Sequence, residues 1–175
     1  IHIHMATIEQ TAPPEILDKI KPLNEVLKSS IVDSRRIAYD LFPVILEKFG
    51  LLTALEELQD LNTTKEITTT LDTTITNSTF QPSIAVHIYR IAQELINNSI
   101  KHAQCTQMHL GLSEKGTLWQ LTYSDNGIGD TNVIKDSNGM GVKNINSRLS
   151  VLRGSLDMHN LNPGVEFKIT FELPK

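Results

Sequence analysis

The sequence predicts an α+β fold, a two-layer sandwich in which helices cover a mixed β-sheet, preceded by an N-terminal helical segment. Two observations support this prediction. Apolar residues recur at steps of three and four over residues 13–62, which is typical of helices. From residue 63 onward, β-branched and alternating stretches are interleaved with further helical patterns, as expected when helices pack on a sheet.

The N-terminal part of the chain divides into a leader and a helical segment. Residues 1–12 begin with Ile-His-Ile-His-Met and resemble a cloning scar with a linker, so they carry no fold argument. Residues 13–62 should form a short helix, a long helix and a third helix over 51–61, because Pro43 and Gly50 should interrupt the run. The apolar stripe of this segment needs a partner helix. Its periodicity fits a cap on the same domain as well as half of a dimerising hairpin.

Residues 63–175 should form the second domain. Residues 63–79 are rich in threonine, which favours strand over helix because β-branched side chains fit a pleated surface. Pro82 suits the first turn of a helix. The later elements predicted from the pattern are a helix over 81–103, strands over 107–113 and 117–124, a helix over 142–152, and strands over 155–160 and 165–173.

Composition excludes several classes of partner and site. The net charge is −4 and no run of lysine or arginine occurs, so no nucleic-acid partner is expected. Cys105 is the one cysteine, which excludes an internal disulfide, fits a reducing cytoplasm and should be buried. No apolar run approaches the roughly 20 residues that cross a bilayer. We therefore expect a soluble cytoplasmic piece, with any membrane anchor in a region upstream of this sequence.

A polar stripe lies along the helix predicted over residues 81–103. At 100° per residue, Glu94, Asn98 and Lys101 gather on one side with His87 and Arg90. The opposite side is mostly apolar and comprises Ile84, Ile88, Ala92, Leu95, Ser99 and Ala103. Mg²⁺ prefers oxygen ligands, and the Asn98 amide oxygen suits it. Taken alone, such a stripe is more often a solvated helix face.

Two glycine motifs follow this helix. Asp125-Asn-Gly-Ile-Gly129 stands where a predicted strand ends, although Asn-Gly is also a common turn. Gly139-Met-Gly141 precedes the next predicted helix, and the free N–H groups at a helix start bind anions, which favours phosphates near Gly141 and Val142. The polar residues between the motifs should form a short mobile lid. The alternative without a ligand is an ordinary loop with a glycine hinge.

The order of these motifs carries a family resemblance. Glu94-Leu-Ile-Asn-Asn-Ser-Ile-Lys-His-Ala103, followed by the two glycine motifs, resembles the ATP-binding domain of sensor histidine kinases, and the likeness covers the chain from Arg35 onward. The resemblance implies a Bergerat-type fold that uses ATP and Mg²⁺. It also implies transfer of the γ-phosphoryl group to a histidine, relay to the receiver domain of a response regulator, and a homodimer through the helical hairpin in the full-length protein.

The resemblance also implies roles for individual residues. Asn98 would be the Mg²⁺ ligand, and Glu94 would orient the metal-bound water or the attacking imidazole. Lys101 would contact a phosphate, His102 would reach the phosphates or the lid, and Asp125 would accept a hydrogen bond from the adenine amine. The residues expected to bind nucleotide are Asn98, Lys101, His102, Asp125, Gly127, Gly129, Gly139, Met140, Gly141 and Val142.

The chain departs from the family pattern in two places. Val165 follows Gly164 where the family often has threonine, so one hydroxyl near the base is missing. No histidine occurs in residues 6–86, and Asp40-Leu-Phe-Pro43 resembles the second helix of the hairpin, so the acceptor helix is absent from this sequence. Arg148 would be a phosphate contact or a surface charge, and we favour the surface charge.

Two rival functions share this pocket. One is a nucleotide-binding module without catalysis, and Glu94 argues against it because a binding pocket alone does not need that carboxylate. The other is a serine kinase of the anti-sigma-factor type, which normally lacks a hairpin helix like the one expected over residues 34–58. Fold analogy alone does not separate these functions.

Overall fold

The computed structural model describes residues 13, 22–23, 26, 44–131 and 140–173. The chain separates into two compact units, Ile1–Pro43 and Val44–Lys175. In the first unit, the described residues at positions 22, 23 and 26 are helical. The other residues of the helices predicted before residue 44 lie outside the described part of the chain. The account below concerns the second unit.

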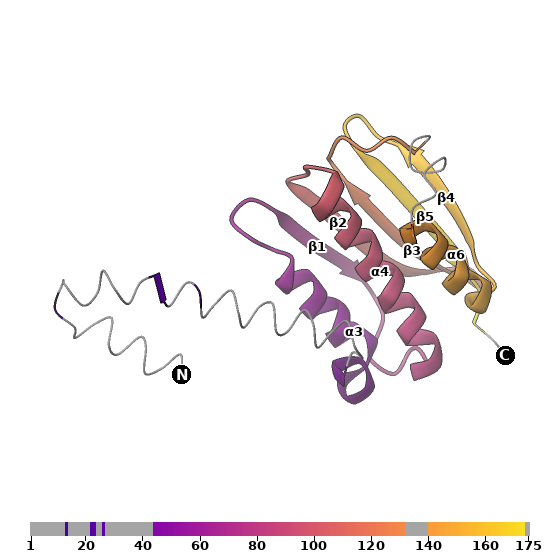
Figure 1. Ribbon diagram of the computed structural model, residues 1–175. Helices are drawn as coiled ribbons and strands as arrows, with labels where there is room; N and C mark the ends of the chain where they lie inside the picture. The colour runs from indigo at the N-terminus through magenta and orange to yellow at the C-terminus, as the bar shows by residue number, and fades with distance from the viewer. Residues whose placement is uncertain (1–12, 14–21, 24–25, 27–43, 132–139, 174–175) are drawn as a thin grey trace. The chain divides into compact units, whose positions relative to one another are not determined.

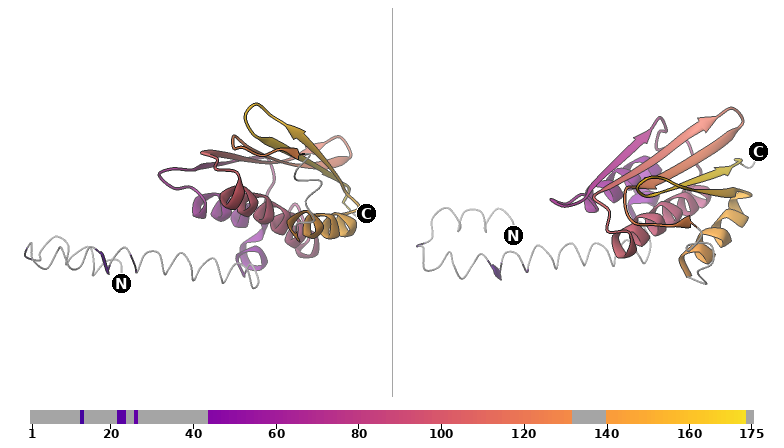
Figure 2. Two further views of the ribbon diagram at one scale, coloured as in Figure 1. Left: turned by 45° about the horizontal axis from the view of Figure 1, so that its top comes forward. Right: turned by 90° about the horizontal axis from the view of Figure 1, so that it is seen from above.

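The second unit is a five-stranded mixed sheet with helices on one face (Figure 1; Figure 2). The strand order is β1-β2-β3-β5-β4, with β1 and β2 parallel and the other pairs antiparallel. The elements are α3 (Val44–Leu61), β1 (Thr68–Thr73), α4 (Pro82–His102), β2 (Gln107–Lys115), β3 (Leu118–Asp125), α6 (Met140–Leu152), β4 (Ser155–Asn160) and β5 (Val165–Phe171). The predicted two-layer α+β sandwich is thereby confirmed.

Helix α4 is the central helix of this unit, and it packs against α3, α6 and β3. It begins at Pro82, whose missing N–H is not needed in the first turn. Its buried face contains every residue that the helical wheel placed on the apolar side, with Ile88 and Ala92 fully buried. Strand β5 supplies the other side of the core, since its residues alternate between buried and half-buried positions.

Helix α3 is kinked at Gly50, as the sequence predicts. Gly50 has a non-helical backbone (φ 84°, ψ 179°), and a Cβ atom there would lie 2.6 Å from the Asn77 Cβ atom. Asn77 fixes the kink, because its Oδ1 atom accepts a hydrogen bond of 3.0 Å from the Thr53 N–H. The helix packs on α4 and β1. The domain boundaries expected after residues 12 and 62 stay predictions.

Two smaller expectations concern burial and membranes. Cys105 is 6% exposed, which confirms that it is a buried residue, and burial together with the Asp125 charge raises the pKa of its thiol. Within the described ranges, the helices are too short or too polar to span a bilayer.

The turn between β4 and β5 is pressed against the end of β3. Gly164 lies in the left-handed region (φ 105°), and a Cβ atom built on it would collide with the backbone oxygen of Asp125. The next residue, Val165, pairs with Asp125 in the sheet. The absence of a side chain at Gly164 therefore allows the start of β5 to lie directly beside Asp125.

Gly164→Ala should destabilise the domain more than Gly116→Ala. Both glycines have positive φ, so both alanines bear a left-handed penalty of about 1–2 kcal/mol. Nothing lies within 4 Å of a Cβ at Gly116, whereas Gly164 is crowded by backbone. We expect the Gly164 variant to lose at least about 2 kcal/mol more in urea unfolding. Equal losses would mean that the turn moves freely away from Asp125.

Candidate functional site

Glu94 and Asn98 meet the first turn of α6. Both side chains are half-buried on α4, one helical turn apart. A Cβ atom built on Gly141 would lie 2.8 Å from Glu94 Oε1 and 2.9 Å from Asn98 Nδ2. A carboxylate and an amide therefore converge on one point beneath the start of α6. A hard cation prefers oxygen donors, so the Asn98 amide oxygen suits Mg²⁺, with the Glu94 carboxylate beside it.

The start of α6 adds donors for an anion to this point. The helix begins at Met140, two residues earlier than predicted, so Gly141 and Val142 lie in its first turn. Backbone N–H groups in a first turn have no partner within the helix and carry the positive end of its dipole. The Gly139 position and the Met140 side chain lie outside the described residues. The arrangement around Gly141 thus offers positive character beside the Glu94 carboxylate and the Asn98 amide.

Asp125 is a buried carboxylate at the end of β3. Its side chain is 4% exposed. The Ser99 hydroxyl donates a 2.5 Å hydrogen bond to Oδ2, and the Gly127 N–H donates a 2.9 Å hydrogen bond to Oδ1. Hydrogen bonds to both oxygens fix the direction of the carboxylate and offset the cost of its burial. Ser99 lies on the apolar side of the helical wheel, so helical periodicity alone does not predict this role.

The glycines after Asp125 hold the loop against its neighbours. A Cβ atom at Gly127 would collide with the Ala103 carbonyl, and the Ile128 N–H donates a 2.9 Å hydrogen bond to that same oxygen. A Cβ atom at Gly129 would lie 2.9 Å from Val165 Cγ1. Each glycine therefore permits a close approach, first to the end of α4 and then to the start of β5.

Lys101 and His102 lie in the last turn of α4, and both are exposed. Neither makes a hydrogen bond or ion pair with another residue in the part of the chain described. Lys101 and His102 follow Asn98 by three and four residues on the same helix, which is about one turn. Their assignment to phosphates or to a lid stays a prediction.

A basic cluster lies at the other end of the polar stripe, where α6 crosses α4. Arg148 is half-buried, and its pKa is lowered by burial and by the Arg90 guanidinium group but raised by Glu94. Burial also lowers the pKa of His87, and the charge of Arg148 lowers it further. The Arg90 Nη1 atom donates a 2.7 Å hydrogen bond to Gln93 Oε1. Arg148 is therefore in electrostatic contact with the stripe and is only partly exposed to solvent.

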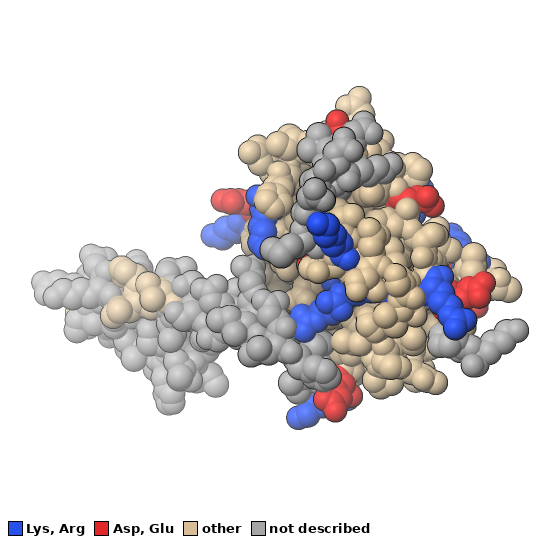
Figure 3. All heavy atoms as spheres, turned by 45° about the vertical axis from the view of Figure 1, so that its right-hand side comes forward, with Lys and Arg blue, Asp and Glu red and all other residues tan. Residues whose placement is uncertain are grey.

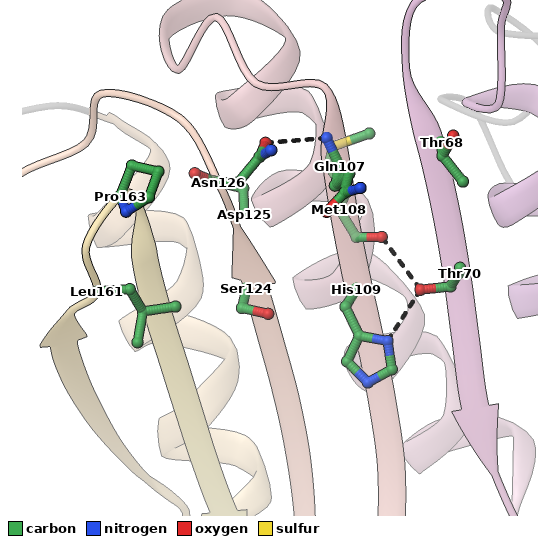
Figure 4. Close-up of a pocket in the computed structure, with 10 residues that line it drawn as sticks. All are labelled: Thr68, Thr70, Gln107, Met108, His109, Ser124, Asp125, Asn126, Leu161 and Pro163. Carbon is green, nitrogen blue, oxygen red and sulfur yellow. Dashed lines mark hydrogen bonds between the residues drawn. The ribbon is translucent and has the colours of Figure 1, made fainter.

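A separate hollow of about 370 Å³ lies on the open face of the sheet (Figure 4). The Thr70 hydroxyl lies 2.9 Å from His109 Nδ1 and donates a 3.4 Å hydrogen bond to the Met108 carbonyl. Ser124 and Leu161 also line it. This hollow is on the face opposite α4, so it is distinct from the convergence at Gly141.

An α+β sandwich in which a glycine loop after β3 and a helix start at Gly141 flank a carboxylate–amide pair and a buried carboxylate has the features of a nucleotide-binding domain. The chain belongs to the histidine kinase-, DNA gyrase B- and HSP90-like ATPase family, whose model matches residues 83–175.

Relatives of known function agree with this family. The chain is 31% identical over 156 residues to the sensor histidine kinase MctS of Rhizobium johnstonii, covering 86% of this chain and 33% of that protein. It is 27% identical over 143 residues to the histidine-protein kinase/phosphatase DegS of Brevibacillus brevis, covering 81% of this chain and 37% of that protein. The chain thus spans about a third of the length of these relatives.

A solved structure shares the fold. The histidine kinase domain of the blue-light activated kinase from Erythrobacter litoralis superposes with a TM-score of 0.58 at 15% identity, covering 70% of this chain and 59% of that one. At this identity the likeness concerns the fold. It supports the arrangement of a mixed sheet under helices.

Ser99→Ala should destabilise the domain through Asp125. The change removes a donor from a buried carboxylate, which should cost about 1–3 kcal/mol in urea unfolding. Ser83→Ala is the matched control, because Ser83 is exposed in the first turn of the same helix and should change stability by less than about 0.5 kcal/mol. If the two variants are equally stable, the Ser99 hydrogen bond does not hold Asp125.

Proposed function

We propose that this chain is the ATP-binding catalytic domain of a sensor histidine kinase, which transfers the γ-phosphoryl group of ATP to a histidine. The convergence of Glu94, Asn98 and Gly141 is the observation that carries the proposal. It puts an amide, a carboxylate and a helix start at one point. The family match and the kinase relatives support the same reaction class.

Asp125 would select the base. Its carboxylate is held by Ser99 and by the Gly127 N–H, so its direction is set before a ligand arrives. A carboxylate accepts a hydrogen bond from the exocyclic amine of adenine and would repel the O6 atom of guanine. The close-packed Gly127 and Gly129 would let backbone approach the base. ATP is therefore the expected nucleotide, in preference to GTP.

The phosphates would lie between α4 and the start of α6. The N–H groups of Gly141 and Val142 would bind phosphate oxygens, and the Asn98 amide oxygen would hold the metal. Bound Mg²⁺ would offset the negative charge that the phosphates carry during transfer. Lys101, about one turn beyond Asn98, would add positive charge at the mouth of the site, and His102 would reach the phosphates or the lid.

Glu94 would act on the acceptor. Its Oε1 atom lies at the same point beneath Gly141 as the Asn98 amide, so its carboxylate would face a group that approaches the phosphates. There it would orient the imidazole that attacks the γ-phosphoryl group and would accept its proton. Positioning and charge supply most of the catalysis in phosphoryl transfer, so small displacements of Glu94 would matter.

The proposal implies partners that this sequence does not contain. The acceptor histidine would stand on the first helix of a dimerising hairpin, whose second helix is assigned to the segment before residue 62. The phosphoryl group would pass to an aspartate on the receiver domain of a response regulator. Because ATP and receiver domains are cytoplasmic, the domain would work in the cytoplasm, and any membrane attachment would come from an upstream region.

Asn98→Ala should abolish Mg²⁺-dependent nucleotide binding, and Asp125→Asn should weaken the preference for ATP over GTP. Isothermal calorimetry with non-hydrolysable analogues, with and without Mg²⁺, measures both effects. Losing the amide oxygen should reduce Mg²⁺-dependent affinity by at least roughly tenfold. Asn97→Ala is the matched control, because Asn97 is the neighbouring asparagine on α4 and points about 100° away. Unchanged affinity and selectivity in both site variants would refute the site assignment.

The chain alone should bind ATP without becoming phosphorylated. Added to a hairpin domain that carries the acceptor histidine, it should transfer radioactive γ-phosphate to that domain. Glu94→Gln should keep nucleotide affinity but slow the transfer by roughly a hundredfold or more, because it removes the proton acceptor. Transfer at the unaltered rate in this variant would exclude the role given to Glu94.

A further inference from the structure

The polar residues of α4 form an ordered row. Asn98, Glu94, Arg90 and His87 follow one another at intervals of about one turn toward the N-terminus, and Ser99, next to Asn98 on the buried side of the helix, binds Asp125. In the proposed function the base lies at the Asp125 end and the metal at Asn98. The row therefore follows the nucleotide from its base toward its last phosphate, and Arg90 lies one turn beyond Glu94.

Helix α6 runs along this row antiparallel to α4, from Asn98 toward His87. Gly141 lies against Glu94 and Asn98, and Arg148 follows seven residues later, which is nearly two turns and hence the same face of α6. The Arg90 charge lowers the pKa of Arg148 and the Glu94 charge raises it, while the Arg148 charge lowers the pKa of His87. The two helices thus bring basic side chains together beyond Glu94.

Two of these basic groups make no hydrogen bond at the atoms that matter here, as far as the described residues go, although the Glu94 charge favours the charged form of Arg148. Arg148 makes no hydrogen bond or ion pair with the residues that the structure describes. The Nδ1 atom of His87 is buried and also lacks a hydrogen-bond partner there. Leaving such groups partly buried beside a second guanidinium group costs free energy, which an anion among them would recover.

We propose that Arg148, with Arg90 and His87 beside it, forms a phosphoryl-binding site that takes the γ-phosphoryl group of the bound nucleotide. This inference rests on the proposed function. A guanidinium group binds two phosphate oxygens at once through parallel N–H donors, which fixes both the position and the orientation of the group. Figure 3 shows the side of the molecule on which α6 lies, with lysine and arginine side chains near its middle and most acidic side chains toward its edges.

The site would act on the group in transfer. The γ-phosphoryl group carries charge on its outer oxygens, and these would face Arg148 while Asn98 holds the metal on the inner side. Glu94 lies between the two sets of residues, so the acceptor imidazole would approach beside the guanidinium groups. ADP lacks the γ-phosphoryl group and would leave Arg148 unbound. Arg148 should therefore distinguish the substrate from the product.

The test compares nucleotides with and without a γ-phosphate. Calorimetry with AMP-PNP and with ADP, both with Mg²⁺, is carried out on the unaltered chain, Arg148→Gln, Arg148→Lys and Arg153→Gln. Arg148→Gln should lose at least roughly tenfold in AMP-PNP affinity, since charge-assisted hydrogen bonds are removed, and should keep its ADP affinity. Arg148→Lys should lose less. Arg153→Gln makes the same change of charge just after α6 and should change neither affinity.

Several results would overturn the assignment. Equal losses for AMP-PNP and ADP would show that Arg148 only supports the shape of the pocket. Unchanged affinities would show that the cluster serves another anion, such as an acidic side chain of a partner helix. If the unaltered chain binds neither nucleotide, the proposed function fails and this inference falls with it, whereas the first two results overturn the inference alone.

The His87 imidazole provides a second readout, by NMR titration. Arg90 and Glu94 lie on the same side of α4 as His87, and the Arg148 charge on α6 lowers the pKa of His87. Arg148→Gln should raise the pKa of His87, because it removes a like charge. AMP-PNP should raise that pKa more than ADP does, because its extra phosphate adds negative charge nearby. A pKa that is the same with either nucleotide would place the γ-phosphoryl group elsewhere.

Discussion

The buried hydrogen bond between Ser99 and Asp125 is the contact on which the two halves of the site depend. It joins the helix that carries Glu94 and Asn98 to the strand end from which the first glycine loop departs. Asp125 also touches the start of β5 through Gly164 and Val165. One carboxylate therefore sets helix, loop and returning strand relative to one another. Burial makes this arrangement rigid, because an unpaired carboxylate in the core is costly.

Helix α4 combines this structural task with a chemical one. Its apolar side fills the core against the sheet, while its polar side faces α6. The site is thus built on a regular element that packing holds in place, which is how rigid positions for binding groups arise. Helix α6 completes it with a start that lacks a side chain at Gly141.

Much of this arrangement follows from the sequence. Periodicity of 3.6 or 2 predicted α4, α6 and β2 to β5 with ends within a few residues, because each element has one buried face, whereas β1 occupies only the middle of the threonine-rich stretch. The order of Glu94, Asp125 and Gly141 along the chain was enough to suggest a nucleotide pocket. The kink of α3 was predicted at Gly50, since glycine there costs the helix most.

Other features depend on tertiary contacts that periodicity does not encode. A helical wheel predicts that Ser99 lies on a buried face. It does not predict that the Ser99 hydroxyl donates a hydrogen bond to Asp125, which is 26 positions away in sequence. The partial burial of Arg148 depends on how α6 crosses α4, which no local pattern gives. For Ser99, the available sequence signal was a serine within an otherwise apolar row of the helix. For Arg148, the signal was its spacing of seven residues from Gly141, which puts both on one face of α6.

The uncovered face of the sheet has a consequence for how this domain varies over evolutionary time. Along β5, Glu166, Lys168 and Thr170 point away from the helices, and Lys168 pairs with Glu166 at 2.8 Å near the surface. Exposed pairs of this kind contribute little to stability. Positions 166, 168 and 170 of β5 can therefore vary in sequence or accept a spectroscopic label at little cost in stability, while the alternate positions and the nucleotide side remain under constraint.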